Sequence, residues 1–293
     1  MTTSHLRACT LALALIASPL SMASSDTHAM PKGELYLVSA GTGDPENMTL
    51  RAHRLIQSAD LVLTMGGRKD ALDALIKDKP VLDAGHGLFG LSIDKKTGEK
   101  LTEEKQLENA VKAARSKKTA EEIRAQRDEN RKRIREAVAA GKKVVIIDNG
   151  DPTIFGPQIG YMNEFADLNP QVVPGPSSFN AANAALARSV VGGKNRAVML
   201  TMAAQMHQDD SADRMARLIA DGTTVVFFME RDTPRFLDAL KKRLPGSTPI
   251  ALVSNAGSQQ SQQVIQATLD TLMARIGENK PKNYLVYVGE FLE

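Results

Sequence analysis

Short, uninterrupted apolar runs alternate with amphipathic stretches along most of the chain. The runs Leu35–Val38 and Val144–Ile147 are short and rich in β-branched or aromatic residues, which indicates strands that are buried on both faces. Another apolar run lies between these two, at 61–63. Residues 49–58, which precede it, repeat apolar side chains at helical spacing. Strands and helices that alternate over short connections predict a parallel sheet with helices on both sides.

The same alternation continues in the second half of the chain. A valine pair at 172–173 leads into an alanine-rich helix that runs through Ala187, and further strands are expected at 197–201, 225–229, 250–254 and 284–288. A chain of 293 residues exceeds the roughly 100–200 residues of a usual domain. We therefore expect an N-terminal α/β domain at 33–168 and a C-terminal α/β domain at 171–293.

The first residues differ in kind from the rest. Arg7 precedes an apolar run, Ala8–Leu20, and Ser21–Ala23 then supplies a small-x-small cleavage pattern, so residues 1–23 are predicted to be a signal peptide. The run is too short to span a bilayer, which takes about 20 residues, so no transmembrane anchor is expected after signal removal. The protein is then periplasmic or secreted. The alternative is that translation starts at Met30 and the protein is cytoplasmic.

Charge is unevenly distributed along the chain. Residues 94–143 hold 16 Lys and Arg against 10 Asp and Glu, and we call this segment the basic helical insert. Within it Arg124, Arg127, Arg131 and Arg135 recur at helical spacing, as an anion or nucleic-acid contact would require. Interleaved acidic residues and the lack of aromatic residues instead favour a solvated helix face, so nucleic acid is not an expected partner.

Two glycine loops, GTGDPE (41–46) and GDPTIFG (150–156), each follow a predicted strand. Ligands of open α/β sheets bind outside the carboxyl ends of the strands, so these loops predict a ligand site, although ordinary turns would have the same composition. The first loop lacks the third glycine of a dinucleotide fingerprint, and Glu46 would oppose a pyrophosphate. Neither loop carries the lysine of a P-loop. A cationic or zwitterionic ligand fits these acidic loops better.

Five segments in order resemble the tetrapyrrole methylase family, which uses S-adenosylmethionine. They are the stretch from Leu35 to Ala59 (YLVSAGTGDPENMTLRAHRLIQSA after the leucine), GDPTIFG, VVPGPSS, TTVVFFM and the closing NYLVYVGE. The resemblance covers nearly all of residues 33–290 apart from the basic helical insert. It implies two α/β domains with a cosubstrate cleft between them, a homodimer, and S-adenosylmethionine as cosubstrate.

Carried over by motif position, the resemblance also implies the cosubstrate-binding residues, which are Thr42, Gly150, Asp151, Ile154, Ser177, Ser178, Met229, Ala256 and Gly257. The Asp151 carboxylate suits a ribose hydroxyl or the ligand's ammonium group, or else a helix cap. Five scattered histidines and a single cysteine, Cys9 in the predicted signal peptide, form no metal-ligand pattern, so no metal is expected.

The acceptor half departs from the family pattern. Thr64-Met65-Gly66-Gly67 stands where uroporphyrinogen methylases carry an acidic residue, and Pro157-Gln158 replaces an arginine. His86, in a glycine-rich loop at 83–87, is the candidate general base, although a lone loop histidine is more often simply exposed. The resulting hypothesis is an S-adenosylmethionine-dependent methyltransferase that acts on a small molecule such as a tetrapyrrole. The alternatives are a non-catalytic exported binding protein for a tetrapyrrole or nucleoside-like ligand, and an RNA or peptide methylase.

Overall fold

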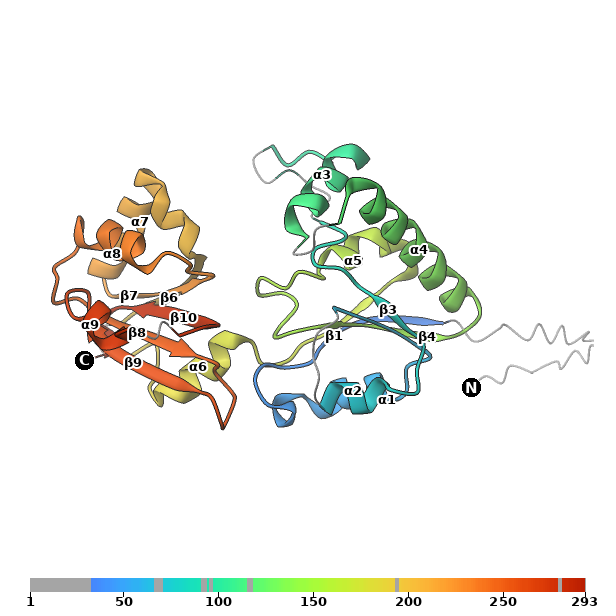
Figure 1. Cartoon of the computed structure of the whole chain (residues 1–293), viewed down its shortest axis with the longest axis horizontal. Coiled ribbons are helices and arrows are strands. Elements are labelled where there is room, and N and C mark those ends of the chain that lie inside the picture. The colour runs from blue at the N-terminus through green and yellow to red at the C-terminus, as the bar shows by residue number, and fades with distance from the viewer. Residues whose placement is uncertain are drawn as a thin grey trace, which may run out of the picture. The chain divides into compact units, whose positions relative to one another are not determined.

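The computed structural model describes residues 33–65, 71–90, 94, 97–114, 118–192, 195–278 and 281–292. The predicted signal peptide at 1–23, the alternative start at Met30 and the pair Gly66-Gly67 lie outside the described residues. In the part of the chain that is described, strands form two five-stranded sheets, each with its own helices (Figure 1). No helix of this part is long and apolar enough to cross a membrane.

The N-terminal sheet is parallel throughout, as the sequence predicts. Its strand order is β3-β2-β4-β1-β5. Alternate residues of β1 serve opposite faces, since Leu35 and Leu37 join one hydrophobic cluster and Tyr36 and Val38 join the other. The strands are β1 (Glu34–Ser39), β2 (Leu61–Thr64), β3 (Val81–Asp83), β4 (Lys143–Asp148) and β5 (Gln171–Val173).

Helices cover both faces of this sheet (Figure 1). Thr49 begins the first helix by accepting a hydrogen bond from the Ala52 amide, and Thr119 and Glu122 form a capping box at the start of the longest helix. One face carries α1 (Leu50–Gln57) and α2 (Ala71–Ile76), and the other carries α3 (Glu103–Ala113), α4 (Ala120–Ala139) and α5 (Gly160–Glu164). Two 3-10 turns, η1 (Pro45–Asn47) and η2 (Ala166–Leu168), complete this half.

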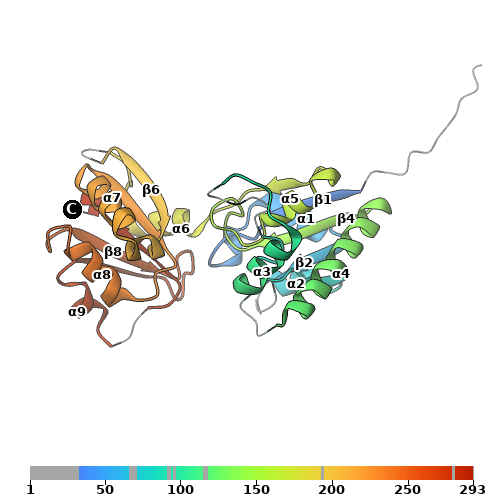
Figure 2. The same ribbon diagram turned by 90° about the horizontal axis from the view of Figure 1, so that it is seen from above.

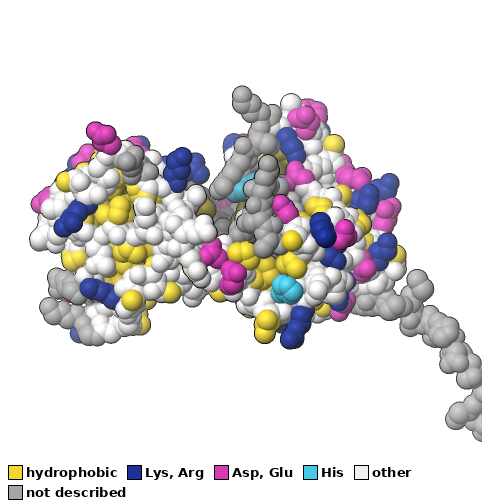
Figure 3. Space-filling model, turned by 60° about the horizontal axis from the view of Figure 1, so that its bottom comes forward, with side chains coloured by type: hydrophobic (Ala, Val, Ile, Leu, Met, Phe, Trp, Pro, Cys, Tyr) yellow, Lys and Arg dark blue, Asp and Glu magenta, His cyan; other side chains and the backbone are white. Residues whose placement is uncertain are grey.

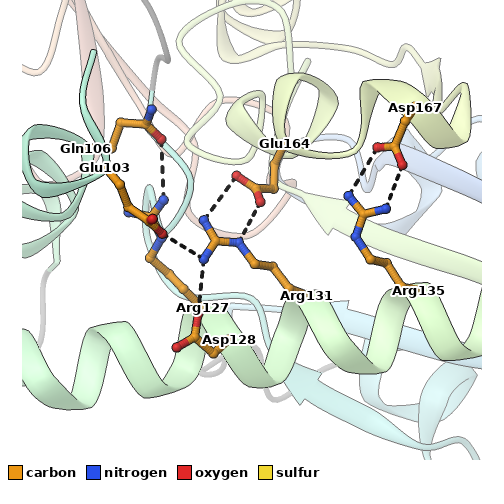
Figure 4. A network of polar contacts seen from close by, with 8 residues as sticks. All are labelled: Glu103, Gln106, Arg127, Asp128, Arg131, Arg135, Glu164 and Asp167. Atoms are coloured by element: carbon orange, nitrogen blue, oxygen red, sulfur yellow. Dashed lines mark hydrogen bonds and ion pairs between the residues drawn. The ribbon is translucent and has the colours of Figure 1, made fainter.

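The predicted solvated face is wrong for part of the arginine row of α4, because Arg127 and Arg131 are turned into the N-terminal half (Figure 4). Arg124 and Arg135 are exposed, whereas Arg127 is 2% exposed and lies 5.3 Å above the ring of Phe89. Arg131 and Arg135 each hold a carboxylate that follows β4 in the chain, Glu164 at 2.6 Å and Asp167 at 2.6 Å. The stripe therefore attaches α4 to α5 and η2, while α3 lies beside α4 (Figure 2).

The C-terminal sheet is mixed, with strand order β6-β7-β10-β8-β9. Only β6 and β7 pair in parallel, and the other three pairings are antiparallel. Its strands are β6 (Ala197–Met202), β7 (Thr223–Phe228), β8 (Pro249–Ser254), β9 (Gln263–Thr268) and β10 (Tyr284–Val288). The sequence did not reveal β9, because four of its residues are only half-buried and its two glutamines, Gln263 and Gln266, are exposed.

Helices pack on both faces of the second sheet as well. One hydrophobic cluster takes buried residues from α7 (Asp209–Ala220), α8 (Thr233–Lys241), α9 (Leu272–Ile276) and η3 (Ala203–His207). The other takes them from α6 (Ser178–Leu186) and η4 (Glu290–Leu292).

Strand β5 was expected to open the C-terminal domain, but it pairs with β1 at the edge of the N-terminal sheet. The chain therefore leaves the first sheet after Val173, a few residues beyond the boundary that the sequence suggested at Asn169-Pro170. The connection is the segment Pro174–Ser177, which leads directly into α6.

Candidate ligand-binding site at the strand ends

The two glycine loops lie side by side. The Gly150 amide donates a 2.7 Å hydrogen bond to the Gly41 carbonyl, and the Ala40 amide donates one of 2.8 Å to the Asp148 carbonyl. Both glycines have positive φ, 73° and 72°, a conformation that is costly for other residues. The loops meet because β1 and β4 are neighbours in a parallel sheet, so their carboxyl ends lie at one edge.

The first loop is also tied to a loop of the C-terminal half. The Asn47 amide group donates to the carbonyls of Thr42 at 2.9 Å and Gly257 at 2.8 Å. A Cβ on Gly43 would come within 2.2 Å of the Gly257 carbonyl carbon, so these two glycines allow direct contact between backbones. The Asp44 amide adds a 2.9 Å bond to the same Gly257 carbonyl.

A cavity of about 1270 Å³ opens beside these loops. Its N-terminal wall includes Gly41–Gly43 after β1 and Asn149 after β4. Its C-terminal wall includes Phe228–Arg231 at the end of β7, three residues at the end of β8 (Val253, Asn255 and Ala256), and Asn283–Leu285 at the start of the antiparallel β10. The cavity thus lies at the strand edge where ligands of α/β sheets bind, and it exceeds the roughly 300–1,000 Å³ of most small-molecule pockets.

Backbone strain is concentrated on the cavity wall. Among the described residues, six that are not glycine have positive φ, and three of those six line the cavity. They are Met229 at 58°, Asn255 at 46° and Asn283 at 52°. A conformation of this kind costs on the order of 1–3 kcal/mol, and such residues cluster at functional sites.

Four of the nine predicted cosubstrate residues line the cavity, namely Thr42, Ser178, Met229 and Ala256. The remaining five, Gly150, Asp151, Ile154, Ser177 and Gly257, are not among the described lining residues, although each is within a few residues of one. The loops that were predicted to form the site therefore do come together.

Two of the five have clear structural roles. Ser177 is buried and caps α6, where it forms a capping box with Asn180. The Asp151 carboxylate accepts a 2.8 Å hydrogen bond from the Thr153 amide and closes a turn, and its contact with a cosubstrate stays a prediction.

Asp148, which sequence reasoning missed, is fully buried at the end of β4. Its carboxylate accepts hydrogen bonds from the amides of Asn149 at 2.8 Å and Gln158 at 3.0 Å, and so it holds both ends of the second glycine loop. Burial raises the pKa of this carboxyl to about 6, although the two amides act in the opposite direction. In the sequence, the signal that could have identified Asp148 is its place as an aspartate at the end of a predicted buried strand.

The loop that carries His86 is held by side chains from two helices and by Gln158, which follows the second glycine loop. The Asn130 amide group donates to the Asp83 carbonyl at 3.0 Å, the Tyr161 hydroxyl to the Ala84 carbonyl at 2.8 Å, and the Gln158 amide group to the Gly85 carbonyl at 2.6 Å. Three consecutive carbonyls are thereby bonded to side chains. The loop is fixed in place rather than merely exposed.

His86 itself lines the cavity. Its Nδ1 lies 3.0 Å from the Ala113 carbonyl at the end of α3. Because a carbonyl only accepts, Nδ1 carries the hydrogen in this contact, and Nε2 is then the nitrogen that can accept a proton in the neutral ring.

Four further lining residues carry charged or phenolic side chains that the sequence did not single out: Lys112, Glu230, Arg231 and Tyr284. The buried Glu230 carboxylate accepts hydrogen bonds from the Thr233 hydroxyl at 2.7 Å and from the Tyr284 hydroxyl. Burial is the largest cause of a raised pKa for Tyr284. These residues come from α3 and from the ends of β7 and β10, which no local pattern relates to one another. Among the described residues no group of three or more His, Cys, Asp or Glu side chains could hold a metal ion.

Comparison with known sequences gives a family match over most of the chain. The sequence model described as Tetrapyrrole (Corrin/Porphyrin) Methylases matches residues 34–273. A siroheme synthase of Psychrobacter sp. (strain PRwf-1) is 32% identical over 282 residues, which cover 92% of this chain and 50% of that protein. A siroheme synthase of Pseudomonas paraeruginosa is 30% identical over 271 residues, 90% of this chain and 51% of that protein. The chain spans about half the length of these curated relatives.

Solved structures share the fold. A cobalt precorrin-4 methyltransferase of cobalamin biosynthesis superposes with a TM-score of 0.60 at 20% identity, covering 89% of this chain and 96% of that one. A uroporphyrin-III C-methyltransferase from Thermus thermophilus, solved in complex with S-adenosylhomocysteine, has a TM-score of 0.57 at 21% identity, covering 89% and 99%. These likenesses confirm the predicted fold class, two α/β domains of the methylase type.

Proposed function

Because this chain belongs to the tetrapyrrole methylase family, we propose that it transfers a methyl group from S-adenosylmethionine to a tetrapyrrole. The observation that carries the proposal is the cavity at the strand ends, whose wall contains parts of four of the five family-like motifs. A relative of the same fold binds S-adenosylhomocysteine, the demethylated product of that cosubstrate.

The lining fits such a cosubstrate chemically. Apolar side chains such as Met229, Val253 and Leu285 can pack against an adenine ring. Hydroxyl and amide groups such as those of Thr42 and Asn255 can bond the ribose and the amino-acid part. When bound, S-adenosylmethionine supplies a methyl group on a positively charged sulfur, so the protein's task is positioning rather than strong acid catalysis.

His86 is the residue that we assign to proton removal. An acceptor that gains a methyl group as a cation equivalent must lose a proton to regain its original charge. The Nε2 atom of His86 can take that proton, because the Ala113 carbonyl holds the ring with its hydrogen on Nδ1. The bonds to the carbonyls of residues 83–85 keep the imidazole at the cavity wall.

The test is incubation of the purified chain with methyl-labelled S-adenosylmethionine and uroporphyrinogen III, followed by mass spectrometry of the porphyrins. The proposal predicts a mass gain of one or more methyl groups and a His86→Gln variant that binds the cosubstrate normally but turns over more slowly. Binding of S-adenosylhomocysteine without any methyl transfer to reduced tetrapyrroles would instead favour the non-catalytic binding protein.

The RNA alternative loses its basis in the structure. Its one supporting feature was the arginine stripe, and three of those four side chains are packed or paired within the N-terminal half. On the face shown in Figure 3, basic and acidic side chains are interspersed and no large area has one sign. Nucleic-acid contacts require a continuous basic surface.

We also propose that residues 1–23 direct export and are removed. The support is the order of charge, apolar run and small-x-small pattern in the sequence. Amino-terminal sequencing of the protein from fractionated cells tests it, with a start near Ser24 in the periplasmic fraction as the expected result. A start at Met30 in the cytoplasm would contradict it. Sedimentation of the same material tests the expected homodimer.

A further inference from the structure

The wall of the cavity carries cationic side chains from both halves of the chain. Lys112 lies in the last turn of α3, and Arg231 follows β7. Glu230 is the one Asp or Glu among the described lining residues, and its carboxylate is buried and receives hydrogen bonds from Thr233 and Tyr284. Among the described lining residues, the two cations Lys112 and Arg231 thus outnumber the one carboxylate.

Lys112 lies next to the group that we assign to proton removal. The following residue, Ala113, supplies the carbonyl that contacts His86 Nδ1 at 3.0 Å. The end of α3, within the basic helical insert, thus forms the part of the wall around His86, whereas the glycine loops and Met229 form the part assigned to the cosubstrate. A cation at this place lies near the imidazole of His86, to which we assign proton removal from the acceptor.

The present partner of Lys112 can be exchanged. Lys112 pairs with Glu108 one turn earlier on α3, and both side chains are exposed. Exposed pairs of this kind contribute little, about 0–1 kcal/mol, so a ligand carboxylate can replace Glu108 at small cost. The same Glu108 carboxylate also binds Lys105 at 2.7 Å, so it keeps a cationic partner when Lys112 turns to the ligand.

We propose that Lys112 and Arg231 bind carboxylate side chains of the acceptor and select a tetrapyrrole that retains many of them. This inference rests on the proposed function and adds the substrate's charge as the selected property. In this chain Pro157-Gln158 replaces the arginine of the family pattern, and Gln158 bonds the Gly85 carbonyl instead. The cations of α3 and of the β7 end supply positive charge from other elements.

The experiment compares Lys112→Glu and Arg231→Glu with the matched control Lys105→Glu. Lys105 lies on the same helix and pairs with the same Glu108, but it is not among the cavity-lining residues. For uroporphyrinogen III we expect KM to rise about tenfold or more in Lys112→Glu and Arg231→Glu, with a smaller change in kcat. Lys105→Glu should stay within about twofold. The increase should be smaller for coproporphyrinogen III, which has fewer carboxylates, and should shrink at high salt.

Binding is measured in parallel, so that failure of the charge proposal and failure of the proposed function are distinguishable. Uroporphyrin III is titrated by its fluorescence into each variant, and S-adenosylhomocysteine binding and thermal unfolding report on the rest of the site. Weaker uroporphyrin binding only in Lys112→Glu and Arg231→Glu supports the inference even if the wild-type chain shows no turnover. Equal uroporphyrin affinity in all folded variants, or equal loss in Lys105→Glu, overturns it.

Discussion

The side-chain amide of Gln158 donates a 2.6 Å hydrogen bond to the main-chain carbonyl of Gly85, the residue before His86. Gln158 is fully buried, and its main-chain amide donates a 3.0 Å hydrogen bond to the Asp148 carboxylate. The end of β4 is thereby linked through Gln158 to the loop of the proposed base. Gln158, which departs from the family pattern, thus connects the end of β4 to the His86 loop.

Replacement of Gln158 by leucine should slow turnover without weakening cosubstrate binding. Gln158→Leu keeps the buried volume but leaves the Gly85 carbonyl without this donor, so the His86 loop shifts. We expect kcat to fall by about 10- to 100-fold, because small displacements of a reacting group have effects of that size. The Kd of S-adenosylhomocysteine, measured by calorimetry, should stay within about twofold. Unchanged kcat in a folded variant would remove Gln158 as a positioning residue.

Asn47 should be required both for stability and for the cosubstrate side of the cavity. Asn47→Ala removes two hydrogen bonds, to the Thr42 and Gly257 carbonyls, which corresponds to about 1–3 kcal/mol in the free energy of unfolding. Asn47→Asp has nearly the same shape but turns an acceptor toward both carbonyls, and it should be the more destabilising of the two. Urea denaturation of both variants measures the difference. If the aspartate variant were as stable as the wild type, Asn47 would not tie the two loops.

Asp148 makes stability depend on pH between about 4 and 6. Its pKa is raised from 3.8 to about 6 in the folded chain, so the folded state binds the proton more tightly than the unfolded state. The free energy of unfolding therefore falls as pH rises through this window, by about 3 kcal/mol at most for a shift of this size. In Asp148→Asn this contribution should be absent. Denaturation at pH 4, 5, 6 and 7 compares the slopes, and identical slopes in the two proteins would contradict the assignment.

Two arginines of α4 should differ sharply in their effect on stability. Arg131 is mostly buried and bonds Glu164 at 2.6 Å, whereas Arg133 is half-exposed with a single pair to Glu129 at 3.7 Å. Arg131→Met should lower the free energy of unfolding by about 2–3 kcal/mol, since Glu164 loses its partner. Arg133→Met should change it by less than about 0.5 kcal/mol. Equal changes in the free energy of unfolding in the two variants would mean that Arg131 stabilises the fold no more than the exposed Arg133 does.

The features that could be predicted from the sequence are those that follow from local periodicity. The strands Leu35–Val38 and Val144–Ile147 are continuous apolar runs, and a parallel sheet necessarily brings the glycine loops after them to one edge. Strand β9 alternates weakly because it is a half-buried edge, and it was missed for that reason. The burial of Arg127 depends on Phe89 and on α5, which are distant in the sequence.

In the site, too, some residues could be predicted from local motifs and others depend on contacts between distant segments. Thr42, Ser178, Met229 and Ala256 lie in motifs that resemble the family, and they line the cavity. Lys112 and Arg231 lie in no motif, since their place on the wall depends on how α3 and β7 end. The bonds that hold the His86 loop link Asn130, Tyr161 and Gln158 to residues more than 40 positions earlier in the chain, a relationship that only the folded structure reveals.

Calorimetric titration of S-adenosylhomocysteine into the chain that begins near Ser24 tests the central claim most directly. The account predicts saturable binding at one site per chain, weakened in Asn47→Asp and unchanged in Gln158→Leu. No heat of binding at millimolar ligand, from a protein that unfolds cooperatively, would contradict the assignment of the strand-end cavity to the cosubstrate.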